Sequence, residues 1–116
     1  MSSKTTTLYR PVNGKELDRI KELGFQAFPP RLSDQPIFYP VLNEQYATEI
    51  TQNWNVPTYG VGYVTKFEVD ADYLKKFKIQ NVGGALHDEL WVPSEELDEF
   101  NEHIIGNIEV IGEYHK

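Results

Sequence analysis

The sequence contains no cysteine, and this absence removes several kinds of chemistry at once. Without thiols the chain has no disulfide framework, no thiolate zinc site and no cysteine nucleophile. Histidine is also scarce: His87, His103 and His115 are scattered, and no pair has the spacing that places two metal ligands on one helix face. No serine lies in a nucleophile-elbow pattern, and no phosphate-binding glycine fingerprint is present. We therefore expect neither a bound metal nor a serine or cysteine nucleophile.

Basic residues and long apolar runs are lacking as well. The chain has 11 lysines and arginines against 18 aspartates and glutamates, which gives a formal net charge of −7 at pH 7. A phosphate backbone would be repelled by this charge, so the composition argues against nucleic acid as a partner. No segment approaches the roughly 20 apolar residues of a membrane span, and residues 1–7 are too polar for a signal peptide. We expect a cytoplasmic protein that does not enter membranes.

What is present is typical of one folded domain. The 116 residues are 40% hydrophobic and 13% aromatic, enough for a core of their own, and residues 1–5 and 113–116 are expected to be flexible ends. Apolar periodicity and breaker residues predict the following order: strand 6–12, helix 14–23, strand 36–42, helix 43–54, strand 62–69, a short helix after Asp70, strands 77–82 and 87–93, an acidic helix through Ile104, and strand 108–111. This order predicts an α+β fold with a curved mixed or antiparallel sheet of five to six strands and three to four short helices.

The second helix and the third strand have the clearest patterns. Asn13 followed by Glu16 has the spacing of a capping box, and Asn43 and Asp70 are expected to cap the helices that follow them. The helix after Asn43 carries an apolar stripe of Tyr46, Ala47, Ile50 and Trp54 before a turn-rich connection at 55–60. Strict alternation in 62–69 predicts that one set of side chains faces the core, namely Tyr63, Thr65, Phe67 and Val69.

Residues 87–93 combine groups that are unusual on one strand. Alternation places His87, Glu89 and Trp91 on one face, with Leu90 and Val92 on the other. If the protein has catalytic chemistry, we expect Glu89 to be its centre. The plainer alternative is an edge strand whose glutamate is merely solvated.

A single glutamate has a distinctive use at a sugar carbon that loses its leaving group, because its carboxylate stabilises the oxocarbenium-like charge. Such a site also needs a cation for phosphate and an aromatic wall. Arg10, Arg31, Tyr39 and Trp91 are residues of the right types. Arg31 follows two prolines on a stiff loop that would aim its guanidinium at an anionic ligand, and the plainer alternative is a surface arginine beside a turn.

The chain resembles a family of small bacterial proteins labelled for ADP-ribosylation and J-type crystallin. The shared segments are 8–12, 28–32, 35–44, 62–69 and 89–97. Its layout is also similar to compact ADP-ribosyltransferase-like domains, and this resemblance implies NAD as substrate, with Arg10 for the ribose or phosphate, Tyr39 as the nicotinamide wall and Glu89 as the catalytic acid. The remaining expected NAD-binding residues are Arg31, Trp91 and His87. Because His87 stands where arginine-modifying members have Glu or Gln, the acceptor of ADP-ribose stays open.

A second hypothesis belongs to a different class. Much of the excess negative charge lies on one short helix near the C-terminus, at Glu95, Glu96, Asp98, Glu99 and Glu102. This pattern is compatible with a non-catalytic acidic module of the immunity or antitoxin type that binds a basic protein partner. It is also compatible with an ordinary solvated helix face.

Overall fold

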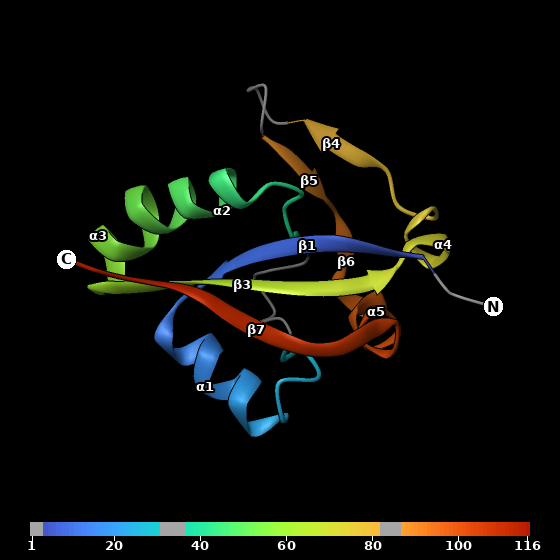
Figure 1. Ribbon diagram of the computed structural model, residues 1–116, viewed down its shortest axis with the longest axis horizontal. Coiled ribbons are helices and arrows are strands. Elements are labelled where there is room, and N and C mark those ends of the chain that lie inside the picture. The colour runs from blue at the N-terminus through green and yellow to red at the C-terminus, as the bar shows by residue number, and fades with distance from the viewer. Residues whose placement is uncertain (1–3, 31–36, 82–86) are drawn as a thin grey trace.

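The computed structural model describes residues 4–30, 37–81 and 87–116, which form an α+β domain as predicted (Figure 1). Its centre is an antiparallel sheet of three strands in the order β1-β3-β7. These strands are β1 (Thr5–Val12), β3 (Val61–Asp70) and β7 (Ile104–His115). The strands expected at 6–12, 62–69 and 108–111 are therefore present, and the two later ones are longer than the sequence pattern predicts.

The sheet continues beyond β1 through a single bridging residue. Val41 pairs with Tyr9 of β1 on one side and with Glu89 on the other. Glu89 belongs to β5 (Asp88–Leu90), whose second neighbour is β4 (Ile79–Asn81). β2 (Ile37–Phe38) and β6 (Val92–Pro93) form a separate antiparallel pair. The expected continuous strand 36–42 is thus a two-residue strand followed by an isolated bridge, because Pro40 has no N–H to donate to a ladder.

Helices cover both faces of the central sheet (Figure 1). α1 (Gly14–Glu22) lies on one side and begins at Asn13, whose side chain accepts a hydrogen bond from the Glu16 N–H at 2.8 Å. α2 (Glu44–Ile50) lies on the other side and is capped in the same way by Asn43. The smaller helices are α4 (Ala71–Leu74), the 3-10 turn η2 (Ser94–Glu96) and α5 (Leu97–Glu102). The predicted caps at Asn13, Asn43 and Asp70 are all confirmed.

Two hydrophobic clusters follow from this arrangement. The larger one contains Phe67 and Val69 of β3 and a group of packed aromatic rings, Phe28, Phe38 and Phe100. The smaller one lies under α2 and is built from Val41, Tyr46, Ala47 and Val64. The alternation predicted for β3 is confirmed at Phe67 and Val69, and Val64 on the opposite face is buried too because α2 covers it.

The second helix departs from its prediction at Thr51. A π-helical turn, η1 (Thr51–Asn55), follows α2, and α3 (Val56–Tyr59) continues the helix through the region expected to be a turn. The Val56 N–H bonds to the Thr51 carbonyl, five residues back. This wider turn rotates the later side chains, so Trp54 is 69% exposed instead of joining the apolar stripe, and Asn55 is buried.

The C-terminal part also differs from its prediction. α5 ends at Glu102, and Ile104 reaches the core from the start of β7. Gly106 has a φ of +78°, which suits glycine, and lies where the pairing of β3 with β7 shifts register. β7 then continues to His115, which pairs with Val61, so residues 113–115 belong to the sheet where a flexible end was expected.

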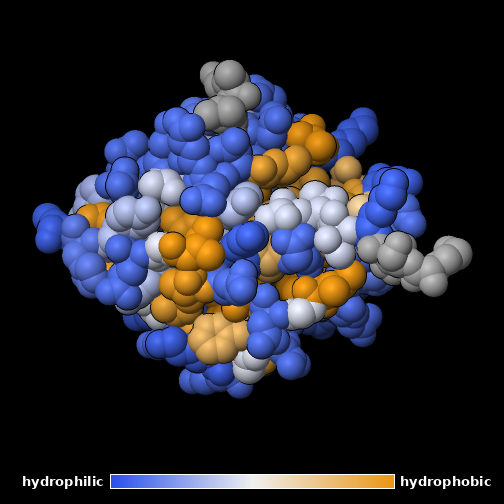
Figure 2. Space-filling model, in the orientation of Figure 1, coloured by the Kyte–Doolittle hydropathy of each residue, from blue (hydrophilic) through white to orange (hydrophobic). Residues whose placement is uncertain are grey.

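β7 is the outer strand of the β1-β3-β7 sheet. Figure 2 shows hydrophobic residues over β7 on an otherwise largely hydrophilic face, and the exposed apolar side chains of this strand are Ile105, Val110 and Ile111. Part of its free edge is covered, because the Ile108 N–H donates to the Phe25 carbonyl at 2.7 Å.

Candidate functional site

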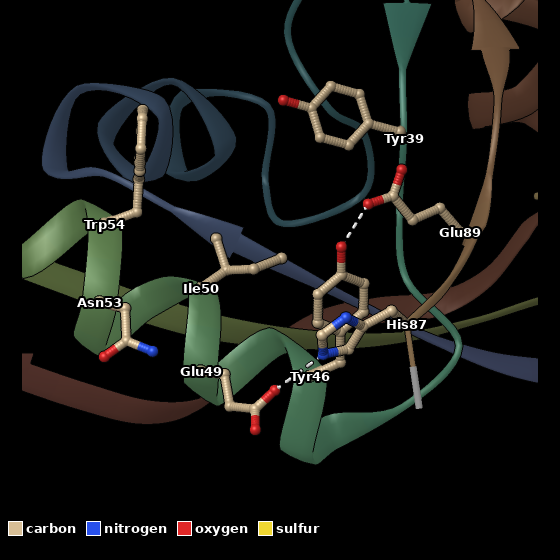
Figure 3. A pocket seen from close by; sticks show the side chains of 8 residues that line it. All are labelled: Tyr39, Tyr46, Glu49, Ile50, Asn53, Trp54, His87 and Glu89. Atoms are coloured by element: carbon tan, nitrogen blue, oxygen red, sulfur yellow. Dashed lines mark hydrogen bonds and ion pairs between the residues drawn. The ribbon is translucent and has the colours of Figure 1, made fainter. Parts of the chain in front are cut away.

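A cavity of about 380 Å³ lies between the α2–η1 helix and the start of β5 (Figure 3). Its size is within the range of small-molecule pockets. The lining side chains come from the segment after β2, from the helix, and from β5 and the residue before it; they are Tyr39, Tyr46, Glu49, Ile50, Asn53, Trp54, His87 and Glu89. The site therefore brings together three of the residues singled out in the sequence, Tyr39, His87 and Glu89.

Glu89 is not the solvated edge residue of the plainer interpretation. Its side chain is only 8% exposed, and its strand has neighbours on both sides. On the side opposite β4, the Leu90 N–H donates to the Pro40 carbonyl at 2.9 Å and the Leu42 N–H donates to the Asp88 carbonyl at 3.1 Å. The carboxylate is thus carried on an inner strand and faces the cavity.

Two neutral donors fix the Glu89 carboxylate. The Tyr46 hydroxyl donates to Oε2 at 2.5 Å, and the Trp91 indole Nε1–H donates to Oε1 at 3.0 Å. A carboxylate oxygen accepts more than one hydrogen bond, so each oxygen keeps capacity for a ligand donor. Glu89 is consequently held in one orientation and remains able to bind a ligand.

Tyr46 is a pocket residue that the sequence alone does not single out, since its place in an apolar stripe explains it as a core residue. Burial, and next the hydrogen bond to Glu89, raise the pKa of the Tyr46 hydroxyl above its ordinary value, so the phenol stays a donor. General chemistry offers one clue to Tyr46 in the sequence. A buried tyrosine hydroxyl needs a polar partner, and an acidic side chain is the first candidate.

Replacing Tyr46 with phenylalanine is expected to lower the free energy of unfolding by about 1.5 kcal/mol at pH 8, because a hydrogen bond to a buried carboxylate is lost. Since the folded-state pKa of Tyr46 is raised, its contribution is complete below about pH 10 and declines as the pH rises further. The variant should therefore lose less stability than wild type between pH 8 and pH 11.

Urea unfolding of Tyr46→Phe and of wild type at pH 8 and at pH 11 measures these changes in the free energy of unfolding. Tyr59→Phe is the matched control, because its hydroxyl belongs to an exposed ring on α3. Equal stability of Tyr46→Phe and wild type at pH 8 would mean that the hydroxyl does not hold Glu89.

His87 lies against Tyr46 at the pocket wall. The two rings stack with centroids 4.3 Å apart and planes 20° apart, and His87 Nε2 is 3.3 Å from Glu49 Oε2. The prediction that His87 and Glu89 share one face of the strand is confirmed, because both line the cavity.

Trp91 is placed differently from Tyr39 and His87. It does not line the cavity and instead contacts Glu89 through its indole N–H. The exposed aromatic side chains of the pocket are Tyr39 and Trp54. Trp91 is therefore a positioning residue for Glu89, whereas Trp54, which the sequence analysis placed in the core, is available to contact a ligand.

Arg10 lies beside the pocket and is engaged inside the protein. Its Nε is 2.6 Å from Glu16 Oε2, and its Nη2 donates to Glu16 Oε1 at 3.0 Å. The guanidinium also packs 4.7 Å from the ring centroid of Phe38 and 5.9 Å from that of Tyr39. Arg10 thus adjoins Tyr39 as expected, but its charge is paired with Glu16 and it is not a lining residue. Arg31 lies outside the described residues.

Within residues 4–30, 37–81 and 87–116, no group of three or more histidine, aspartate and glutamate side chains is arranged to hold a metal ion. In the same ranges, no helix combines the length and the apolar character needed to cross a membrane. Comparisons of the chain with protein-family models, with curated proteins and with solved structures gave no match.

Proposed function

We propose that the protein binds NAD in the Glu89 pocket, as an ADP-ribosyltransferase-like domain. The observation that carries the proposal is the buried Glu89 carboxylate, oriented by Tyr46 and Trp91 and sharing its cavity with the exposed ring of Tyr39. A fixed acceptor beside an aromatic surface suits a ribose attached to a flat heterocycle.

In the proposed complex the nicotinamide ring lies against Tyr39 and the ribose hydroxyls donate to Glu89. The bond between the anomeric carbon and the nicotinamide nitrogen breaks, and its electron pair stays on nicotinamide. The carboxylate stabilises the positive charge that develops on the sugar. Water or an acceptor group then bonds to the anomeric carbon and releases a proton.

The pyrophosphate of NAD requires positive charge near the pocket. No lysine or arginine lines the described part of the cavity, and Arg10 is paired with Glu16. Arg31, which the sequence analysis assigned to an anionic ligand, is therefore the first candidate for this contact.

Isothermal titration of the wild-type protein with NAD tests the proposal. We expect binding with a dissociation constant of about 1 mM or tighter, and roughly tenfold weaker binding by Glu89→Gln, which corresponds to about 1.4 kcal/mol. Glutamine preserves the fold because its amide can donate to the Tyr46 hydroxyl while its oxygen accepts from Trp91.

Glu22→Gln is the control, since it removes the same charge from an exposed position on α1. A folded wild-type protein that gives no binding signal at millimolar NAD would overturn the proposal.

The contacts of the acidic residues near α5 weaken the second hypothesis, that of a non-catalytic acidic module that binds a basic protein. Lys76 Nζ lies 2.6 Å from Glu96 Oε1 and 2.7 Å from Glu99 Oε1, so two of the five acidic groups already have a cationic partner. Glu95, Asp98 and Glu102 remain exposed. A basic protein that co-purifies with wild type and is lost when these three residues are changed to lysine would favour this alternative; its retention would argue against it.

A further inference from the structure

Acidic side chains line the Glu89 pocket, and no permanently charged basic side chain of the described lining balances them. Glu49 and Glu89 line the cavity, and the described lining contains no lysine or arginine. The described lining therefore holds two carboxyl groups and one imidazole, and no permanent cation. The nearby guanidinium of Arg10 does not offset the two carboxyl groups, because it makes two contacts with the carboxylate of Glu16.

Glu89 itself is unusual as a buried acid. Its contacts to described residues are hydrogen bonds from two neutral groups, the Tyr46 hydroxyl and the Trp91 indole. Burying a carboxylate without an opposite charge is costly, and the cost falls when a cation binds beside it. The open side of the carboxylate is the cavity.

Aromatic rings surround the same space. Figure 3 shows Trp54 rising from the helix on one side of Ile50, with Tyr39 and Glu89 on the other side. Trp54 is 69% exposed although indole is strongly apolar, and Tyr39 is also exposed. The negative faces of such rings attract cations, tryptophan most strongly. Rings and carboxylates together form the environment that recognises pyridinium or quaternary ammonium groups.

We propose that the Glu89 pocket selects a positively charged ligand group, a pyridinium or quaternary ammonium, over a neutral group of the same shape. This rests on the pocket being the ligand site proposed above, but it does not require that the ligand be NAD. Applied to NAD, it means that the oxidised form, whose nicotinamide ring is cationic, binds in preference to the reduced form.

Titration of the protein with choline and with 3,3-dimethylbutan-1-ol, followed by NMR, provides the test. The two molecules have the same shape, and carbon replaces the charged nitrogen in the second. We expect choline to bind at least tenfold more tightly, and 1-methylnicotinamide to bind more tightly than nicotinamide. Equal affinities within both pairs would overturn the proposal.

Two variants test whether the preference for choline arises in the Glu89 pocket. Trp54→Leu removes an exposed ring that no core contact needs, and it should reduce choline affinity about fivefold with little effect on the neutral alcohol. Glu89→Gln should reduce choline affinity about tenfold, whereas Glu22→Gln should leave it unchanged. Unchanged choline affinity in both pocket variants would show that binding occurs elsewhere and would overturn the proposal.

The outcomes for NAD and for choline are separable. Preference for choline without NAD binding supports cation selection and rejects NAD as the ligand. NAD binding without preference for the cationic member of either pair rejects cation selection and leaves the proposed function standing.

Discussion

Replacing Arg10 with methionine is expected to lower the free energy of unfolding by about 3 kcal/mol, because it removes a cation that makes two short contacts with the largely buried Glu16 carboxylate. Methionine keeps an unbranched side chain against Phe38, so the main loss is electrostatic. If Arg10 were instead held in place for a ligand phosphate, the unliganded protein would tolerate the substitution well.

A double-mutant cycle measured by urea unfolding checks this expectation. Glu16→Gln alone should also destabilise the fold, and the double variant should lose clearly less than the sum of the two single variants, since the pair is removed together. Additive losses, or an Arg10→Met variant within 0.5 kcal/mol of wild type, would contradict a structural ion pair.

The same variants separate a structural role from a ligand role. Glu16→Gln releases Arg10 while keeping its positive charge beside Tyr39. If the guanidinium binds NAD phosphate, this variant binds NAD as well as or better than wild type, and Arg10→Met alone loses affinity. With a purely structural role, both folded variants retain NAD affinity to a similar degree.

The predictions that succeeded are those set by local sequence. Side-chain caps act within three residues, so Asn13, Asn43 and Asp70 were recognisable, and the alternation of β3 identified Phe67 and Val69 as core residues. Alternation also placed His87 and Glu89 together. Fold class followed from the order of these local elements.

The predictions that failed depended on partners chosen by tertiary structure. Glu16 was explained by its spacing from Asn13, which concealed its contact with Arg10. Tyr46 and Glu89 are 43 positions apart, so the hydrogen bond that orients the site leaves no local pattern. The π turn likewise lies close against β3 at Gly62, a long-range contact that helical periodicity does not reveal, and the periodicity places Trp54 on the wrong face.

Gly62→Ala tests that packing and is expected to lower the free energy of unfolding by about 2 kcal/mol, because a new side chain would overpack a close helix–strand contact. A Cβ at Gly62 would lie 2.6 Å from Thr51 Cγ2 and 3.0 Å from Asn55 Cβ. Both neighbours are buried, so neither has room to move away. Gly14→Ala is the control, since a Cβ there meets nothing within 4 Å, and it should be neutral or slightly stabilising.

Adding Thr51→Ser to Gly62→Ala should recover much of the lost stability. Serine lacks the Cγ2 methyl that meets the new Cβ, and it keeps the hydroxyl that donates to the Ala47 carbonyl at 2.8 Å. Since η1 also carries Asn53 and Trp54 into the pocket, Gly62→Ala should weaken choline binding in the folded protein, and the double variant should restore it. Recovery of stability without recovery of binding would separate the π turn from ligand recognition; failure of Thr51→Ser to recover either would place the origin of the destabilisation outside this contact.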